Sequence, residues 1–84
     1  MKPLRWSDEK SCKLKKERGL SFDELVAERF LGIEKSSSRS NQWLMLFDVK
    51  GYVWAVPYVD AGNSYFLKTA FPSRKHTKTY LKGS

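Results

Sequence analysis

Two apolar runs joined by a two-residue turn constrain the fold of this chain more than any other feature. The runs are residues 43–49 and 52–59, and Lys50 and Gly51 lie between them. A two-residue connection containing glycine between such runs is typical of a β-hairpin. In a strand, successive side chains point to opposite faces of the sheet. The first run is apolar at the positions of both faces, as expected for a strand that is covered on both sides. The sequence therefore predicts an antiparallel sheet with residues 43–49 near its centre.

A third strand is predicted over residues 65–71, because residues 60–63 have the composition of a turn and Pro72 ends the run. Residues 4–6 form a candidate short strand near the start of the chain. Pro57 lacks an amide hydrogen, so it predicts a sheet edge or a bulge at its position. The sheet is therefore expected to be an antiparallel meander of three to four strands.

Capping residues delimit two predicted helices ahead of the hairpin. The first is expected over residues 8–18, with Ser7 as its N-cap and Gly19 just past its C-terminal end. The second is expected over residues 22–30, because residues 21–24 read S-x-x-E, the pattern of a capping box. Both helices are expected to pack on one face of the sheet.

The remaining segments complete the predicted architecture. Residues 31–42 contain a glycine and a run of serines, which predicts a loop. Ser73 is a candidate N-cap for a last short helix over residues 74–81. The expected fold class is α+β, as a single domain over residues 1–84. It has two N-terminal helices packed on an antiparallel three- to four-stranded sheet, followed by a short C-terminal helix.

Composition supports a folded domain and narrows its class. Hydrophobic residues make up 40% of the 84 residues and aromatic residues 14%, which argues against wholesale disorder. Cys12 is the single cysteine, so neither an intramolecular disulfide nor a cysteine-based zinc site can form. No apolar run approaches the roughly 18–20 residues of a membrane helix, and no signal-peptide core begins the chain. We therefore expect a cytoplasmic protein without membrane contact.

Positive charge gathers in two parts of the sequence. Lys and Arg number 16 against 9 Asp and Glu, which gives a net charge of +7 at pH 7. The cations concentrate in residues 10–18 and 73–84, while residues 43–67 are nearly neutral. A field of this sign attracts nucleic acid, an anionic membrane surface or an acidic protein. Solubility alone is the alternative explanation, since small domains often carry several net charges.

The common catalytic and metal-binding motifs are missing from the sequence, so no metal and no other cofactor is expected. Residues 68–80 remain the best candidate, because they combine cations, an imidazole, hydroxyls and an aromatic ring. RNA supplies its own nucleophile, the 2′-hydroxyl. A metal-free ribonuclease therefore needs only positioning, proton transfer and cations at the phosphate.

Nine residues are candidates for such a site. The catalytic candidates are Arg74 for the phosphate, His76 for proton transfer, Tyr80 for stacking on a base and Thr69 for orienting the scissile group. The RNA-binding candidates are Lys16, Arg18, Lys68, Lys75 and Lys78. Each group also has a purely structural interpretation: a solvated C-terminal tail, an anchor for the last helix, or favourable cations at a helix C-terminus.

Two segments of the sequence resemble known toxins and nucleases. Trp6-x-x-x-Lys10, then Gly19 and Leu20-Ser21-Phe22-x-Glu24, are similar to the opening W-D-x-x-K…K-H-G-I-S-F-E-E of BrnT-type toxins. The run Thr69-Ala70-Phe71-Pro72 resembles the T-A-[YF]-P element of the broader barnase–colicin–RelE nuclease grouping. This resemblance implies a RelE-like fold, a cognate antitoxin as partner, and cleavage of mRNA that is free or on the ribosome.

The chain departs from that family at two points. Glu17-Arg18 replaces the family's Lys-His before the glycine, so one cation is reversed and one acid–base group is lost. The family's later I-S-A-R element is not visible, and only Arg74 can stand in for its arginine. The resemblance therefore supports the fold and the toxin–antitoxin context better than it supports a particular catalytic set.

The leading hypothesis is the toxin of a type II toxin–antitoxin pair, acting as a metal-independent endoribonuclease. Its products would be a 2′,3′-cyclic phosphate and a 5′-hydroxyl. The alternatives are a non-catalytic basic module that binds nucleic acid, and a gyrase-directed toxin on the same scaffold. The hypothesis also predicts that the clusters around Arg18 and Arg74 converge into one groove that holds a polyanion.

Overall fold

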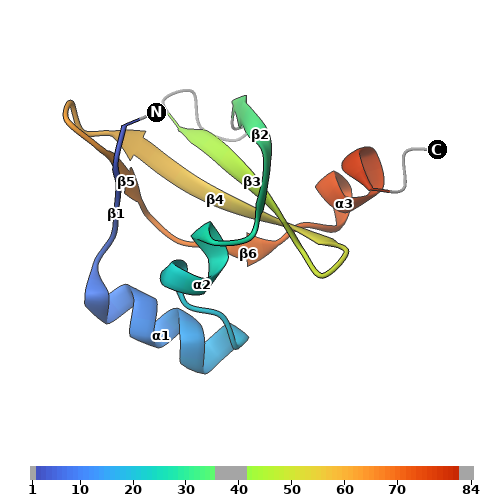
Figure 1. The fold of residues 1–84 in the computed structure, drawn as a ribbon, viewed down its shortest axis with the longest axis horizontal. Coiled ribbons are helices and arrows are strands. Elements are labelled where there is room, and N and C mark those ends of the chain that lie inside the picture. Colours follow the sequence, from blue (N-terminus) through green and yellow to red (C-terminus); the bar gives the residue numbers. More distant parts are fainter. Residues whose placement is uncertain (1, 36–41, 82–84) are drawn as a thin grey trace.

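The computed structural model describes residues 2–35 and 42–81 as an α+β fold, in which three helices pack on a mixed β-sheet (Figure 1). The strands follow the order β1-β5-β4-β3-β2, and β6 also pairs with β4. In chain order the elements are β1 (Leu4–Arg5), α1 (Asp8–Arg18), α2 (Phe22–Val26), β2 (Arg29–Lys35), β3 (Trp43–Val49), β4 (Tyr52–Asp60), β5 (Tyr65–Leu67), β6 (Phe71–Pro72) and α3 (Arg74–Tyr80).

Helix α1 has the predicted boundaries and caps. The Ser7 side chain accepts a hydrogen bond from the backbone N–H of Lys10. Gly19 adopts φ 79°, in the left-handed region, and its N–H donates to the Lys15 carbonyl at 2.9 Å. A left-handed glycine at this position is a standard helix end, because glycine adopts this conformation without a Cβ penalty. The sequence prediction of this helix is confirmed.

Helix α2 begins with the predicted capping box but ends earlier than predicted. Ser21 and Glu24 bond reciprocally through side chain and backbone. The helix stops at Val26, so the prediction that it continues to residue 30 is wrong. Phe30 lies instead in β2, opposite Phe47, with the two ring centroids 5.6 Å apart. Pairing with a neighbouring strand outweighs the helical periodicity of this segment, as tertiary contacts often do.

Strand β2 also corrects the predicted loop. Residues 31–35 belong to β2 and pair antiparallel with β3. The register shifts between Phe30 and Gly32, which marks a bulge, and Gly32 adopts φ 153°. The rest of the predicted loop, residues 36–41, lies outside the described residues. The glycine that favoured a loop therefore belongs to a bulged strand.

The central hairpin follows the prediction closely. Strands β3 and β4 pair from Trp43 opposite Tyr58 to Val49 opposite Tyr52. Lys50 and Gly51 have φ values of 52° and 86°, so both turn residues are left-handed. Such a turn matches the right-handed twist of the two strands it joins.

The predicted third strand is divided in two, and the sheet is not purely antiparallel. Strands β5 and β6 are separated by residues 68–70, and β1 pairs with β5 in parallel. The Pro57 carbonyl accepts from the Lys68 N–H at 2.8 Å, so the Pro57 nitrogen faces the same segment without a hydrogen to donate. Pro57 thus lies in a central strand beside an irregularity, which fits the predicted bulge but not a sheet edge.

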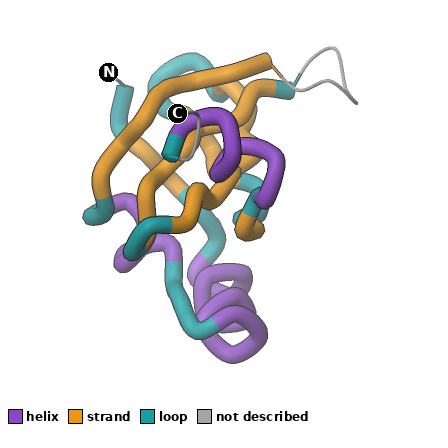
Figure 2. Tube along the Cα trace, turned by 90° about the vertical axis from the view of Figure 1, so that its right-hand side faces the viewer, coloured by secondary structure: helices purple, strands orange, loops and turns teal. Residues whose placement is uncertain are grey.

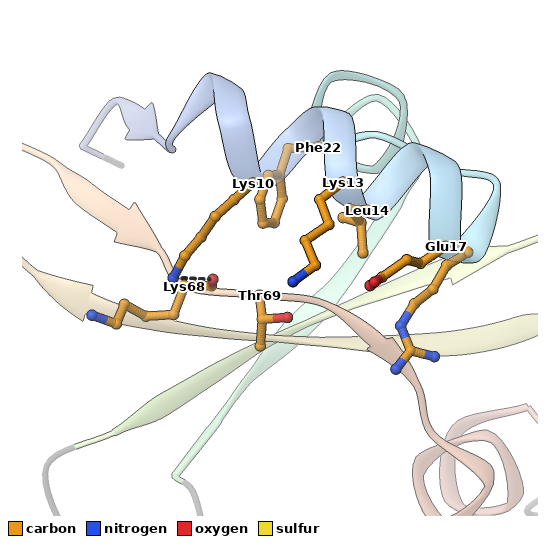
Figure 3. Close-up of a pocket in the computed structure, with 8 residues that line it drawn as sticks. Lys10, Lys13, Leu14, Glu17, Phe22, Lys68 and Thr69 are labelled. Atoms are coloured by element: carbon orange, nitrogen blue, oxygen red, sulfur yellow. Dashed lines mark hydrogen bonds between the residues drawn. The ribbon is translucent and has the colours of Figure 1, made fainter.

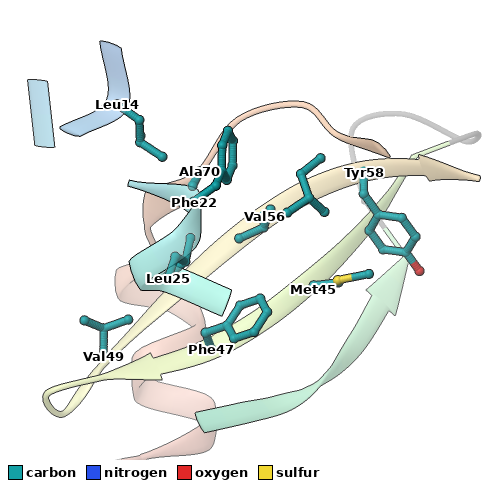
Figure 4. Close-up of a cluster of buried hydrophobic side chains, with 10 residues drawn as sticks. Leu14, Phe22, Leu25, Met45, Phe47, Val49, Val56, Tyr58 and Ala70 are labelled. Carbon is teal, nitrogen blue, oxygen red and sulfur yellow. The ribbon is translucent and has the colours of Figure 1, made fainter. Parts of the chain in front are cut away.

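The two faces of the sheet carry separate apolar clusters. Helices α1 and α2 cover one face, where their side chains pack on β3, β4 and β5 (Figure 4); the buried members are Leu14, Phe22, Leu25, Met45, Phe47, Val49, Val56, Tyr58, Leu67 and Ala70. Buried Leu46, Val53 and Ala55 point to the opposite face, where Leu31, Leu44 and Leu81 pack on them. Since Leu81 directly follows α3, this helix lies on the face that α1 and α2 leave open (Figure 2).

Helix α3 is fixed to β4 through the backbone of Val53. The Val53 carbonyl accepts from the Ser73 N–H at 2.8 Å, and the Val53 N–H donates to Thr77 Oγ1 at 2.8 Å. Thr77 Oγ1 in turn donates to the Ser73 carbonyl at 2.7 Å. Thr77 is 5% exposed, so these groups are satisfied within the protein.

Replacing Thr77 with valine is expected to destabilise the protein by about 1–3 kcal/mol, because the buried Val53 N–H loses its acceptor. Thr77→Ser keeps the hydroxyl and is the matched control. Chemical denaturation of the two variants measures the difference. Equal stability of the valine and serine variants would show that this hydrogen bond does not hold α3 in place.

Candidate nucleic-acid interface

A hollow of about 200 Å³ lies between α1 and the segment that separates β5 from β6. We call it the basic hollow; its lining residues are Lys10, Lys13, Leu14, Glu17, Arg18, Phe22, Lys68 and Thr69. Figure 3 shows Lys10, Lys13 and Glu17 extending from α1 toward the strand segment that carries Lys68 and Thr69. Four of the lining side chains are cationic and one is a carboxylate, so the hollow is suited to an anion.

Helical spacing and the strand break together build the basic hollow. Lys10, Lys13 and Glu17 follow one another at intervals of three and four residues, which places them on one face of α1. The break after β5 brings Lys68 opposite this face, and the Lys68 carbonyl accepts from Lys10 Nζ at 3.4 Å. Buried Leu14 and Phe22 supply its apolar part. The hollow therefore combines cationic side chains with an apolar floor. Such an arrangement can receive both a phosphate and part of a nucleobase.

Other cations of α1 are directed elsewhere. Lys15 Nζ pairs with the Glu24 carboxylate at 2.8 Å. This hydrogen bond and the backbone N–H of Ser21 lower the pKa of Glu24 to about 2. Lys16 lines a different surface depression, beside Lys15 and Cys12. The structure therefore separates Lys16 from Arg18, although both are RNA-binding candidates.

A second polar cluster links α3 to β2. His76 Nδ1 lies 2.6 Å from Ser73 Oγ, and His76 Nε2 lies 3.1 Å from Glu34 Oε1. The Tyr80 hydroxyl donates to Glu34 Oε2 at 2.6 Å. An ionised carboxylate only accepts, so Nε2 carries the hydrogen toward Glu34, and in the neutral ring Nδ1 accepts from the Ser73 hydroxyl. His76 therefore links α3 to β2 through Nε2, and through Nδ1 it bonds to Ser73, the N-cap of α3.

These contacts shift the acidity of the cluster. The hydrogen bond from Tyr80 lowers the pKa of Glu34 below its ordinary value of 4.5, and His76 lowers it further. The same bond to the negative carboxylate raises the pKa of Tyr80 above 10.0. Glu34 is therefore ionised, and Tyr80 protonated, throughout the neutral range.

Glu34→Gln is expected to lower stability at pH 7 by about 1 kcal/mol, a modest value because the side chain is partly exposed. Since the folded state lowers the pKa of Glu34, its contribution is complete above pH 4.5 and is lost as the pH falls through the folded pKa. Denaturation curves of wild type and variant should therefore converge in acid. Glu28→Gln, which removes a carboxylate just before β2, is the control. A difference that persists unchanged at low pH would contradict this role of Glu34.

Two cations of α3, Arg74 and Lys78, line a separate hollow of about 320 Å³ with Tyr52. Its members on the helix are Arg74, Thr77 and Lys78. Lys75 is exposed and contributes to the lowered pKa of Glu34 through its charge. Among the described residues, the cations of α3 therefore do not form one continuous row.

The structure brings together some of the predicted site residues and separates others. Arg18, Lys68 and Thr69 line the basic hollow. His76 and Tyr80 lie in the Glu34 cluster, and Arg74 and Lys78 lie in the hollow beside Tyr52. The predicted single groove between Arg18 and Arg74 is wrong: each lines a hollow of its own, on helices that cover opposite faces of the sheet (Figures 1 and 2).

Several residues at these sites were not among the nine predicted, and Glu17 was noted only as a departure from the family pattern. Lys10 and Lys13 share a helical face with Glu17, and this spacing is the signal that could have indicated them. Tyr52 lines a hollow with residues of α3, and Glu34 bonds to His76 of α3. Helix α3 follows both residues by more than twenty positions in the chain. No local sequence pattern predicts a contact between residues so far apart. Glu34 also fell within the predicted loop.

Comparison with known proteins adds no further constraint. Searches of family models, of curated proteins and of solved structures find no match for this chain. No helix in the described part of the chain is long and apolar enough to cross a membrane. Among residues 2–35 and 42–81, no group of three histidine, cysteine or acidic side chains is placed to hold a metal ion. The assignment of function therefore depends on the sites themselves.

Proposed function

We propose that the protein binds RNA in the basic hollow and cleaves it without a metal, as the toxin of a type II toxin–antitoxin pair. One observation carries this proposal. Cations from α1 and from the residues after β5 line one hollow, although they are about fifty residues apart in the chain; they are Lys10, Lys13, Arg18 and Lys68. The hollow also contains a carboxylate, Glu17, and a hydroxyl, Thr69.

These groups match the needs of attack by the ribose 2′-hydroxyl. The 2′-oxygen bonds to phosphorus while its proton passes to Glu17, the carboxylate among the residues that line the hollow. The bond from phosphorus to the 5′-oxygen then breaks, and that oxygen takes a proton from a lysine, for which Lys13 is the nearest candidate along the helix face. The other cations stabilise the added charge at phosphorus. The products are a 2′,3′-cyclic phosphate and a 5′-hydroxyl.

The toxin context draws on the resemblance of residues 6–24 to BrnT-type proteins. Two N-terminal helices on one face of a small sheet are consistent with a RelE-like scaffold. Under this proposal the partner is a cognate antitoxin, and the substrate is mRNA. Glu17 and Arg18 stand where the family has Lys-His. The proposal therefore assigns the proton transfer to Glu17 rather than to a histidine.

A second function, binding of RNA without cleavage, has one specific observation in its favour. His76, the single histidine, lies outside the basic hollow with both ring nitrogens bonded to Ser73 and Glu34. The Tyr80 hydroxyl is also bonded to Glu34. These contacts engage His76, the residue predicted to transfer a proton, and Tyr80, the residue predicted to stack on a base, in structural interactions, so cleavage depends on Glu17.

Incubation of the purified protein with a single-stranded RNA in EDTA separates the two functions. The proposal predicts cleavage that leaves 2′,3′-cyclic phosphates and stops when 2′-deoxynucleotides replace the ribonucleotides. Glu17→Gln should slow cleavage about a hundredfold or more while RNA is still bound. His76→Gln should change the rate by less than about threefold, because that ring holds α3 rather than the substrate.

The results that contradict the proposal differ for its two parts. Binding by the wild-type protein without cleavage would establish the non-catalytic module. Cleavage that survives Glu17→Gln but fails in His76→Gln would move the reaction to the Glu34 cluster. Absence of both binding and cleavage would remove RNA as the substrate.

A further inference from the structure

Strand β2 ends the sheet with an unpaired outer edge. It pairs with β3 on one side, and no strand in the described part of the chain pairs with its other side. An exposed strand edge is a template for another strand, and proteins normally protect such edges with charges, bulges or covering segments. The bulge at Phe30–Gly32 interrupts this edge, so its regular part is residues 32–35.

The backbone groups of this edge point outward at alternate residues. Both backbone groups of Val53 bond to the α3 segment, so they point away from β3. Asp48 of β3 is opposite Val53, so its N–H and C=O groups point toward β2. Backbone groups alternate along a strand, so those of Leu44, four residues earlier in β3, also point toward β2. Leu44 is opposite Glu34. Glu34 therefore bonds to β3, and Ile33 and Lys35 direct their N–H and C=O groups to the open side.

An apolar patch lies along the same edge. Phe30, Ile33 and Trp43 are 41%, 40% and 44% exposed, three of the six large hydrophobic side chains exposed to this degree in the described residues. Phe30 is opposite Phe47 and Ile33 opposite Met45, while Trp43 shares the alternation of these two β3 residues. All three side chains therefore stand on one face of the sheet, beside the area that α1 and α2 cover. We call them the edge patch.

Charge decides between the possible occupants of this edge. Arg29 and Lys35 lie at the two ends of β2, and Lys35 is opposite Trp43, on the same face as the edge patch. A second copy of the chain would bring two molecules of net charge +7 together, with these cations near each other. An acidic segment meets no such repulsion and gains from both cations.

We propose that β2 binds an extended segment of an acidic partner protein as an added strand. Main-chain hydrogen bonds to Ile33 and Lys35 align the segment, as in other cases of strand addition. Its apolar side chains cover the edge patch, and its acidic side chains lie near Arg29 and Lys35. None of these residues lines the basic hollow, so the proposal does not depend on the binding or cleavage of RNA.

The test uses a fluorescently labelled synthetic peptide that alternates valine with glutamate, titrated with the full chain. Saturable binding is expected, and a peptide in which lysine replaces glutamate should bind at least tenfold more weakly. Methylation of alternate backbone nitrogens in the acidic peptide should abolish binding, because it removes the main-chain donors without changing the side chains. The change in tryptophan fluorescence that is lost in Trp43→Ala offers a second readout at the site itself.

Protein variants distinguish strand addition at the β2 edge from nonspecific hydrophobic binding to the edge patch. Ile33→Pro and Ile33→Thr both remove the apolar contact, but only the proline removes the outward N–H, and it leaves the β2–β3 hydrogen bonds in place. Trp43→Ala and Ile33→Thr should each weaken binding about tenfold, and Ile33→Pro more than either. Tyr52→Ala, an exposed aromatic on another surface, should bind the peptide as wild type does. Thermal unfolding confirms that each variant is folded.

Three results would overturn the proposal. One is the absence of saturable binding by the acidic peptide. Another is equal binding by wild type, Trp43→Ala and Ile33→Pro. The third is a concentration-dependent dimer of the protein alone that Ile33→Pro abolishes, since this would assign the edge to a second copy of the chain.

Discussion

Simultaneous replacement of Lys10, Lys13 and Lys68 by alanine is expected to weaken RNA binding about a hundredfold. Each exposed lysine that contacts a phosphate contributes about 1 kcal/mol, and three such losses amount to roughly two powers of ten in affinity. All three residues line the basic hollow, and Lys10 and Lys68 lie directly beside each other. Fluorescence anisotropy with a labelled single-stranded RNA measures the change, and the salt dependence should flatten because fewer counterions are released.

A single replacement, Lys13→Ala, has a matched control in Lys16→Ala. Lys16 and Lys13 are both exposed lysines on α1, but Lys16 lines a different depression. Lys13→Ala alone should reduce the slope of log affinity against log salt by about 0.7 for single-stranded RNA, while Lys16→Ala leaves it unchanged. Equal effects of the two replacements would mean that the total positive charge, rather than the basic hollow, attracts the RNA.

Phe22→Ala is expected to destabilise the protein by about 3–5 kcal/mol, a large part of the total stability of a small domain. Phe22 is 1% exposed, and its ring packs against that of Trp6 with centroids 5.8 Å apart. Its removal leaves a cavity between the two N-terminal helices and the sheet. Loss of the folded baseline in a denaturant titration, or a midpoint shifted far toward low denaturant, is the expected observation.

Phe71→Ala is the control for this core substitution. Phe71 lies in β6 and is 36% exposed, so the same truncation there should cost under about 1 kcal/mol. Similar losses from the two substitutions would mean that the cluster beneath α1 and α2 is not the main core of the protein.

The parts of the fold that depend on local signals could be predicted from the sequence. The caps at Ser7 and Gly19 define α1, and Lys50-Gly51 defines the hairpin, because each acts through its own backbone and near neighbours. The end of α2 could not be predicted in this way. Phe30 fits a helical stripe locally, but it pairs with Phe47 in the sheet, and that contact depends on the whole fold. The division of the last strand likewise depends on Pro57 in a neighbouring strand.

The candidate site was predicted in part for the same reason. The sequence placed Arg18, Lys68 and Thr69 among the candidates, and all three line the basic hollow. It could not show that α1 and α3 lie on opposite faces of the sheet, so Arg18 and Arg74 were expected in one groove and lie in two. The partner of His76 was also missed, because Glu34 enters the cluster from a strand that was predicted as a loop.

Where RNA contacts the protein is the central question, and crosslinking answers it directly. RNA carrying photoreactive thiouridine is bound to the full chain, irradiated and digested, and the crosslinked peptides are identified by mass spectrometry. Crosslinks in peptides from residues 10–18 and 68–70 are the expected result, because these segments form the walls of the basic hollow. Crosslinks confined to residues 74–80, with none in α1, would contradict the account.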